Sequence, residues 1–273
     1  MSPEVRGATR VAGIIGDPVT HSRSPAIWNA AFREAGIDWV FVAFPVAAGA
    51  ATAAVGGMRS LGIAGLTVTM PHKSEAARAC DDLSPTAKAL EAVNAIVNRD
   101  GVLAGDSTDG EGLVRSLLDE GVEPAGRQCV IVGAGGAARA IARALGDAGS
   151  EVVVAARRMD AAVAAAALAP DGRALELENV ADELGGADLV VNATPVGMGG
   201  EPPPIDVALL SATAVVVDTI YHPAETPLLA AAGGRGLRAV GGLGMLVHQA
   251  ALSFESFTGV PAPLDAMRAA AGP

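Results

Sequence analysis

Lysine and aromatic residues are scarce in this chain of 273 residues. Lys73 and Lys88 are the only lysines, aromatic residues make up 3% of the sequence, and there are two cysteines, Cys80 and Cys129. A core with so few aromatic side chains must be built mainly from alanine and aliphatic residues. The cysteines lack the spacing of metal ligands, so we expect free thiols in a reducing compartment.

Positive charge is in deficit as well, with 19 basic and 30 acidic residues and a net charge of -11 at pH 7. Nucleic acids and anionic membranes bind to a positive face, so neither is expected as the main partner. No apolar run is long enough to span a bilayer and no signal-peptide core is present, which predicts a cytoplasmic protein. The four histidines lack ligand spacing, so no metal site is predicted.

The apolar residues form two series of alternating strands and helices. Hydrophobic residues make up 51% of the chain, and 273 residues are enough for two domains. Helices are predicted at 25–35, with Ser24 as the N-cap, and at 109–120, and a hairpin is predicted around Asp100 and Gly101. The main predicted strands lie at 11–15, 39–45, 65–69, 93–98, 128–132, 151–155, 189–192 and 215–218. This alternation predicts an α/β fold class.

A glycine-rich turn follows the predicted strand 128–132. The turn consists of Gly133, Ala134, Gly135, Gly136, Ala137 and Ala138. Gly133 permits a tight turn, Gly135 lets the backbone approach a pyrophosphate, and the N-terminus of the next helix offers free N–H groups to phosphate. A tight connection without a ligand is the alternative, but the strand before and the helix after favour dinucleotide binding.

The end of the next strand indicates which nicotinamide cofactor is bound. NAD enzymes usually place Asp or Glu there, to accept a hydrogen bond from the ribose 2′-hydroxyl. This chain has Arg157 and Arg158 instead. Two guanidinium groups suit a 2′-phosphate, so NADP is predicted, with a pair of solvated surface arginines as the alternative.

Polar motifs also lie outside the nucleotide-binding pattern. Ser22 and Ser24 stand in a loop before a helix, where they could hold a polyol or a carboxylate or simply cap the helix. Thr69 and Lys73 lie just past the end of a predicted strand, where open α/β sheets bind ligands. A lone lysine is usually solvated, but a lysine in this position is a candidate for chemistry.

Two further motifs are ambiguous on their own. Asn94 is a single amide in an apolar strand, which usually ties down backbone and could also bind a hydroxyl group. Asp109 lies between glycines before a helix, where carboxylates are common caps. Neither residue is assigned a role from its local sequence alone.

The order of these motifs closely resembles that of the shikimate dehydrogenase family. The motifs are Gly16-x-Pro18-x-x-His21-Ser22-x-Ser24-Pro25, Val68-Thr69-x-Pro71-x-Lys73, Ala92-Val93-Asn94, Gly105-Asp106-x-Thr108-Asp109-Gly110 and the glycine-rich turn, followed by segments 192–194, 218–221, 226–228 and 242–249. The resemblance implies two α/β domains. These are an N-terminal substrate-binding sheet with flanking helices, at 1–112 plus 243–273, and a C-terminal Rossmann-type doubly wound NADP domain, at 113–242.

The resemblance also implies a role for each site residue. Lys73 transfers the proton and is paired with Asp109. The substrate is bound by Ser22, Ser24 and Tyr221 at its carboxylate, and by Thr69, Lys73, Asn94, Asp109 and Gln249 at its ring hydroxyls. The cofactor is bound by Gly133, Ala134, Gly135, Gly136 and Ala137 at the pyrophosphate, by Arg157 and Arg158 at the 2′-phosphate, and by Thr219 and Gly242 beside the nicotinamide.

The implied reaction is the reversible NADP-dependent reduction of 3-dehydroshikimate to shikimate, in chorismate and aromatic amino acid biosynthesis, by a monomer or a homodimer. Three positions depart from the family. Thr67 and Ser107 stand where it often has Asn, and Ala156-Arg157-Arg158 stands where it often has Asn-Arg-Thr. Because Thr67 bears on a substrate hydroxyl, a quinate/shikimate or aminoshikimate dehydrogenase is an alternative, as is a non-catalytic ligand-binding regulator on the same fold. A generic Rossmann-type reductase would not need the N-terminal motifs.

Overall fold

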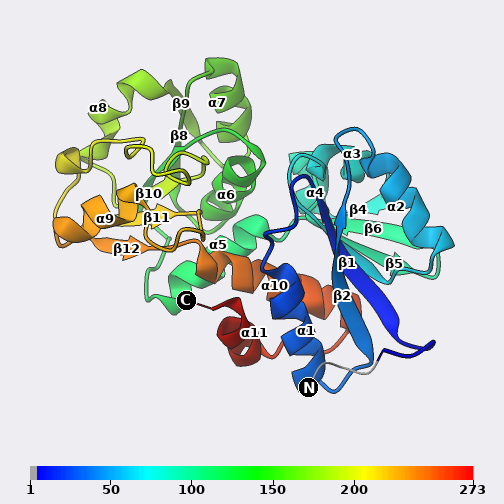
Figure 1. Ribbon diagram of the computed structural model, residues 1–273. Coiled ribbons are helices and arrows are strands. Elements are labelled where there is room, and N and C mark those ends of the chain that lie inside the picture. Colours follow the sequence, from blue (N-terminus) through cyan, green and yellow to red (C-terminus); the bar gives the residue numbers. More distant parts are fainter. Residues whose placement is uncertain (1–4, 273) are drawn as a thin grey trace. The chain divides into compact units, whose positions relative to one another are not determined.

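The computed structural model describes residues 5–272, which divide into two compact units (Figure 1). The first unit runs to Thr108 and resumes at Val247, and the second unit is the continuous segment Asp109–Leu246. The second unit is therefore inserted into the first along the chain.

The first unit contains a mixed sheet of six strands in the order β2-β1-β3-β5-β6-β4. The strands are β1 Arg10–Gly16, β2 Trp39–Pro45, β3 Gly65–Val68, β4 Asp82–Leu83, β5 Ala95–Arg99 and β6 Val102–Asp106. β1 is parallel to β2 and β3, whereas β5 is antiparallel to both β3 and β6. The carboxyl ends of β1, β3 and β6 therefore share one edge with the amino end of β5.

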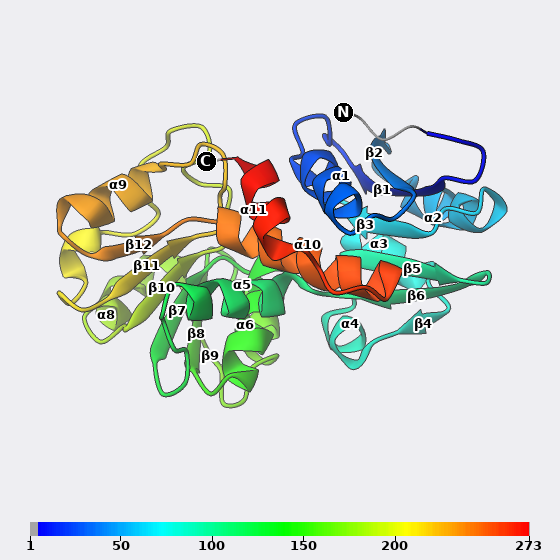
Figure 2. The same cartoon turned by 90° about the horizontal axis from the view of Figure 1, so that it is seen from below.

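Helices cover both faces of this sheet. They are α1 Ser24–Glu34, α2 Ala51–Ser60, α3 Lys73–Arg78, α4 Pro85–Leu90, α10 Leu243–Thr258 from Val247 onward, and α11 Leu264–Ala271. Side chains of α2, α3 and α4 form one core cluster with the sheet. α1 packs against α11, as Figure 2 shows.

The predicted capping role of Ser24 is wrong. The N-cap position of α1 is Arg23, no side chain caps the helix, and Ser24 is its first residue. The Oγ of Ser22 accepts a hydrogen bond from the backbone N–H of Ser24 at 3.2 Å. Since Ser22 satisfies this N–H and Pro25 has none, the helix can begin one residue earlier than predicted.

Aromatic side chains, few as they are, gather in one cluster of the first unit. Trp28 of α1 is fully buried, with ring centroids 4.8 Å from Phe41, 5.8 Å from Phe254 and 5.0 Å from Phe257. A Cβ atom on Gly65 of β3 would overlap the Phe257 ring. Helix α10 thus completes the core of the first unit, and it packs against a strand that is more than half the chain away along the sequence.

The second unit is built on a parallel sheet of six strands in the order β12-β11-β10-β7-β8-β9. The strands are β7 Gln128–Val132, β8 Glu151–Ala156, β9 Arg173–Glu176, β10 Leu189–Asn192, β11 Val215–Asp218 and β12 Arg238–Val240. Counted from β7, this is the doubly wound order 3-2-1-4-5-6. The order reverses between β7 and β10, where such sheets bind dinucleotides.

Helices lie on both faces of the second sheet. They are α5 Asp109–Asp119, α6 Gly136–Asp147, α7 Met159–Ala166, α8 Ala181–Leu184 and α9 Pro227–Gly234, with 3-10 turns at Leu177–Asn179 and Val207–Leu209. One core cluster joins α5, α6 and α7 to the sheet, and another joins α8 and α9. A Cβ atom on Gly110 would overlap the Ala140 carbonyl, so α5 and α6 pack backbone to backbone at this point.

Within residues 5–272, no helix has both the length and the apolar composition needed to cross a membrane. The same residues contain no group of three or more His, Cys, Asp or Glu side chains that could hold a metal ion.

Candidate active site

Backbone hydrogen bonds bring two polar segments together at one edge of the first sheet. The N–H of Val68 donates to the carbonyl of Asn94 at 2.8 Å, and the N–H of Val93 donates to the carbonyl of Lys73 at 3.1 Å. The segment that carries Thr69 and Lys73 therefore lies directly beside Asn94. This proximity follows from the antiparallel pairing of β3 and β5, which puts the end of one strand next to the start of the other.

Asn94 is the centre of a buried hydrogen-bond network. Its side chain is 3% exposed and donates to Thr108 Oγ1 at 2.9 Å and to Gln249 Oε1 at 3.2 Å. Its own Oδ1 accepts from the Thr108 N–H at 2.8 Å, and Thr108 Oγ1 donates to the Gln249 carbonyl at 3.1 Å. Two predicted site residues, Asn94 and Gln249, are thus joined by Thr108, to which the sequence analysis assigned no role.

Asp109 directly follows Thr108 and is the first residue of α5. It is buried, at 8% exposure. A carboxylate at this position is favoured by the positive end of the helix dipole. Asn94 and Gln249 hold Thr108 in place through hydrogen bonds, so the residue that precedes Asp109 has a fixed position in the first unit.

The loop with Ser22 and Ser24 starts at the same edge of the first sheet. The N–H of Asp17 donates to the Met70 carbonyl at 3.0 Å. A Cβ atom on Gly16 would overlap the Thr69 methyl group, so the ends of β1 and β3 approach closely. Ser24 is buried and Ser22 is half-buried.

His72 is a buried residue that the sequence analysis left without a role. Its Nε2 lies 2.7 Å from the Val46 carbonyl, which is the geometry of a hydrogen bond donated by the ring. This bond ties the residue before Lys73 to the loop after β2. No partner for Nδ1 occurs in the described part of the chain. A histidine next to a lysine is an ambiguous signal in sequence, because the burial that gives it a structural role is set by tertiary packing.

In the second unit, the glycine-rich turn joins β7 to α6. Gly133 has φ +114°, and a Cβ atom there would lie 2.9 Å from the Thr194 methyl group. Gly135 is the N-cap of α6 and no side chain caps the helix, while the space around the Gly135 Cα is open. The free N–H groups and the open backbone fit an anionic pyrophosphate.

Arg157 and Arg158 follow the last residue of β8, and both are exposed. Arg158 Nε lies 3.7 Å from Asp160 Oδ1, and both side chains are more than three-quarters exposed. An ion pair this exposed contributes little to stability and leaves the arginine able to bind another anion. The described residues therefore fit NADP at this strand end.

Thr219 and Gly242 lie side by side past the ends of β11 and β12. A Cβ atom on Gly242 would overlap the Thr219 carbonyl. Thr219 Oγ1 donates to the Asn192 carbonyl at 3.0 Å. Tyr221 follows two residues later and is half-buried. The structure thus brings the two predicted nicotinamide-side residues together at the carboxyl edge of the second sheet.

The loop that carries Thr219 is anchored by Asp218, which is fully buried. Thr226 Oγ1 donates to Asp218 Oδ2 at 2.7 Å, and Asn192 Nδ2 and the Ile220 N–H donate to Oδ1, each at 3.1 Å. Burial raises the pKa of Asp218, and these hydrogen bonds partly oppose the rise. In the sequence Asp218 stands only as part of a motif, and nothing local indicates this anchoring role.

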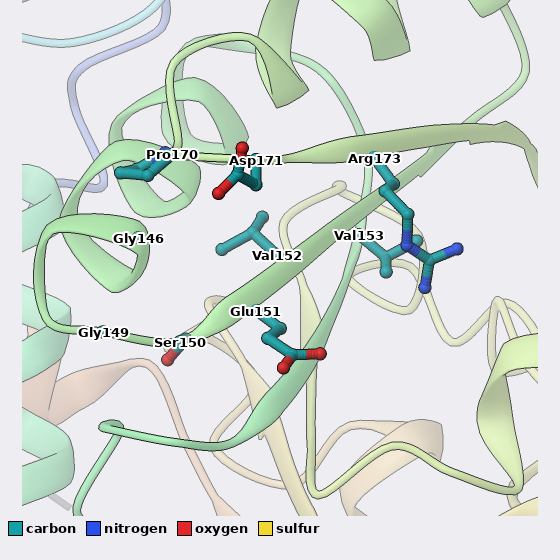
Figure 3. A pocket seen from close by; sticks show the side chains of 9 residues that line it. All are labelled: Gly146, Gly149, Ser150, Glu151, Val152, Val153, Pro170, Asp171 and Arg173. Atoms are coloured by element: carbon teal, nitrogen blue, oxygen red, sulfur yellow. The ribbon is translucent and has the colours of Figure 1, made fainter.

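One cavity in the second unit, of about 370 Å³, lies at the opposite edge of that sheet (Figure 3). It is lined by Glu151 and Arg173, the first residues of β8 and β9, and by Gly146 and Gly149 near the end of α6. Arg173 Nη1 donates a hydrogen bond to Glu183 Oε1 at 2.8 Å. The glycine-rich turn, Arg157 and Arg158 lie at the carboxyl ends of the strands, so this cavity is separate from the candidate cofactor site.

The second unit combines a doubly wound parallel sheet with a glycine-rich turn and paired arginines, which are the features of an NADP-binding domain. The first unit contributes a sheet edge lined with polar residues. Together they define an NADP-dependent oxidoreductase with a separate substrate-binding unit. The comparisons with known proteins narrow this class. Residues 14–96 match the shikimate dehydrogenase substrate binding domain, and residues 242–271 match the shikimate 5′-dehydrogenase C-terminal domain. Residues 121–197 match a model of NAD(P)-binding domains.

Whole proteins match over nearly their full length. The shikimate dehydrogenase (NADP(+)) of Symbiobacterium thermophilum is 46% identical, with 97% of this chain and 95% of the relative covered. The crystal structure of shikimate 5-dehydrogenase from Thermus thermophilus in complex with NADP(H) and shikimate has a TM-score of 0.89 and 34% identity, covering 96% and 98% of the two chains. Quinate dehydrogenase from Corynebacterium glutamicum in complex with NAD has a TM-score of 0.88 and 32% identity, with the same coverage.

The chain belongs to the shikimate dehydrogenase family. The predicted family, the two-domain α/β fold class with a Rossmann-type domain, and the NADP-dependent oxidoreductase class are confirmed.

Proposed function

We propose that this chain catalyses the reversible NADP-dependent reduction of 3-dehydroshikimate to shikimate, a step in chorismate and aromatic amino acid biosynthesis. The observation that carries the proposal is the buried network at one edge of the first sheet, where Asn94, Thr108 and Gln249 hold one another beside the backbone of Lys73. A generic reductase does not need such a preformed set of hydroxyl-binding groups, whereas a cyclic polyol does.

The first unit is proposed to bind the substrate. Ser22 and Ser24 would bind the carboxylate, with Tyr221 of the second unit at the same end of the substrate. The ring hydroxyls would be bound by Thr69, Lys73, Asn94, Asp109 and Gln249. An amide group can donate and accept, which suits hydroxyl groups that also do both. A ring hydroxyl would take the place of the 3.2 Å hydrogen bond between the Asn94 and Gln249 side chains.

Lys73 is proposed to handle the proton and Asp109 to pair with it. Bound NADPH would supply the hydride that the ketone carbon receives. The carbonyl oxygen becomes a hydroxyl by taking a proton from the Lys73 ammonium, and in the reverse direction the neutral amine takes that proton back.

The second unit is proposed to bind NADP at the carboxyl edge of its sheet. The pyrophosphate would lie on Gly133, Ala134, Gly135, Gly136 and Ala137. Arg157 and Arg158 would bind the 2′-phosphate, and Thr219 and Gly242 would lie beside the nicotinamide. The buried Asp218 would fix the position of Thr219.

A quinate or quinate/shikimate dehydrogenase is the second candidate, and the observation in its favour is Thr67. This residue is 5% exposed, and its Oγ1 lies 3.4 Å from the Gly13 carbonyl, to which it donates. A threonine whose hydroxyl points to the sheet backbone leaves more room than an asparagine would. Quinate, with one more hydroxyl than shikimate, needs such room.

The remaining parts of the proposal concern partners and compartment. We propose small molecules as the only ligands, a monomer or homodimer as the working form, and the cytoplasm as the compartment. The two free thiols, Cys80 and Cys129, are consistent with a reducing compartment. Gel filtration with light scattering distinguishes monomer from dimer.

Initial rates with shikimate and quinate, each with NADP and NAD, test the proposed function through absorbance at 340 nm. We expect the highest kcat/KM with shikimate and NADP. A higher kcat/KM with quinate would replace this proposal by the second candidate. No absorbance change with any of the four pairs would support the non-catalytic regulator instead.

A further inference from the structure

Arg139, in the first turns of α6, has a buried polar atom with no partner. In residues 5–272 no acceptor lies within hydrogen-bond distance of its Nε, although the atom is inaccessible to solvent. The residue as a whole is half-buried, so part of the side chain can still be reached by a ligand. A buried N–H group without a hydrogen-bond partner costs free energy, so the position of the Arg139 Nε needs an explanation.

The face of α6 that carries Arg139 is turned toward α7. Residues separated by four and seven positions share a face of a helix, so Arg139, Arg143 and Gly146 lie on one face. A Cβ atom on Gly146 would lie 2.7 Å from Ala169 and 2.8 Å from Pro170, which follow α7. α6 and α7 pack against each other on the same face of the sheet, as Figure 1 shows.

The direction of the helices places Arg139 near the start of α7. Both helices follow parallel strands, so they run in the same direction. Arg139 precedes Gly146 by seven residues, a rise of about 10 Å, and helical side chains lean toward the N-terminus. This geometry brings the first turn of α7, which immediately follows Arg157 and Arg158, within reach of the Arg139 side chain.

We propose that Arg139 is a third arginine of the 2′-phosphate site and selects NADP over NAD. This inference rests on NADP being the cofactor, as proposed above. A 2′-phosphate carries close to two negative charges and three acceptor oxygens, so it can accept from several guanidinium groups at once. Arg158 is already near a carboxylate, that of Asp160, whereas no carboxylate pairs with Arg139 in the described residues. Arg139 thus has its positive charge available for the phosphate.

Calorimetric binding of adenosine 2′,5′-bisphosphate and of 5′-ADP to the full-length chain tests this inference, since only the first probe carries the 2′-phosphate. In Arg139→Gln we expect the Kd of the bisphosphate to rise about tenfold or more, the loss of one charge-assisted hydrogen bond, while the Kd of 5′-ADP stays within about twofold. Arg139→Lys should keep part of the affinity.

Arg143→Gln is the matched control. Arg143 lies one turn along the same face, and its buried Nε likewise has no hydrogen-bond partner in residues 5–272, but the Asp147 carboxylate lies 3.5 Å from that Nε. The Arg143→Gln change should leave both Kd values unchanged. If Arg139→Gln raises the Kd of both probes equally, Arg139 acts at the pyrophosphate or in a structural role, and the inference is overturned. Unchanged Kd values for both probes would also overturn it. If the wild-type chain does not prefer the bisphosphate, the proposed NADP specificity itself fails.

Discussion

Asn94 illustrates how a single buried side chain can organise a site. It bonds to Thr108, fourteen residues away, and to Gln249, on a helix formed by the last part of the chain. Such an amide uses both its donor and its acceptor groups within the protein, which fixes its orientation before any ligand arrives.

Lys73 and Lys88 provide a matched pair for testing the proposed chemistry, because they are the only lysines. Lys73→Ala should lower kcat by about a hundredfold or more, the usual contribution of a general acid or base. NADP binding should be unchanged, because the proposed cofactor site is made by other residues. Lys88 is exposed on α4, so Lys88→Ala should keep wild-type turnover. Steady-state kinetics measures kcat, and fluorescence titration of NADPH measures cofactor binding. A near wild-type kcat in Lys73→Ala would refute the assignment.

The thiols should be unreactive in the folded protein. Burial raises the pKa of Cys80 to about 11, with the neighbouring Asp81 adding to the rise, and burial also raises the pKa of Cys129. Each pKa unit changes the thiolate fraction tenfold, so Cys80 should react with a disulfide reagent about a hundredfold more slowly at pH 8 than a thiol of ordinary pKa. The rate should climb with pH up to about 11. Fast labelling of native protein at pH 8, compared with urea-unfolded protein, would contradict this expectation.

At the scale of elements, sequence patterns located the strands whose apolar runs are continuous. β10 and β11 begin and end at the predicted residues, and the predicted hairpin turn at Asp100 and Gly101 joins β5 to β6. The two-residue strand β4 and the short helices α3, α4 and α8 had no such pattern, because elements this short are specified by their tertiary neighbours rather than by local periodicity.

The candidate site shows the same division. Motif residues such as Lys73 and Gly133 could be found locally, because their chemistry depends on the strand end or turn that carries them. The pairing of Asn94 with Gln249 could not, because it depends on how α10 packs against the first sheet. The unpartnered Nε of Arg139 likewise results from helix packing, which local sequence does not predict.

Two glycines of the β7–α6 turn should respond differently to the same substitution. Gly135→Ala meets no atom within 4 Å and has an ordinary backbone conformation, so the thermal midpoint should stay nearly unchanged. NADP affinity should nevertheless fall, because the methyl group occupies the space where the pyrophosphate approaches. Gly133→Ala should lower the midpoint itself, since φ is +114° and the methyl group would press on Thr194. Differential scanning fluorimetry with and without NADP measures both effects, and an unchanged NADP shift in Gly135→Ala would contradict the turn's role.

At the scale of the whole molecule, the first unit is assembled from two distant stretches of chain and the second from one. The fluorescence of the chain can follow this difference, because both tryptophans, Trp28 and Trp39, lie in the first unit. Trp28 is buried partly by Phe254 and Phe257 of α10. The second unit has no tryptophan, so its state must be followed by nucleotide binding.

Deletion of residues 247–273 should therefore affect the two units unequally. Removing Phe254 and Phe257 exposes Trp28, so tryptophan emission should shift to longer wavelength as in an unfolded chain. Adenosine 2′,5′-bisphosphate binding should persist, because residues 109–246 contain the whole second sheet and its core clusters. Emission of the wild-type wavelength in the truncated chain would show that α10 is dispensable for the core of the first unit.

The closure of the aromatic cluster by α10 also sets an order of events on the ribosome. The second unit is complete in the emerging chain as soon as Leu246 has left the exit tunnel, and it can fold at once. Trp28 is synthesised long before Phe254 and Phe257, which bury it in the folded chain. The first sheet therefore lacks α10 and α11 throughout synthesis of the second unit. The stretch from Arg10 to Thr108 is consequently the part of the nascent chain that most needs protection from premature association.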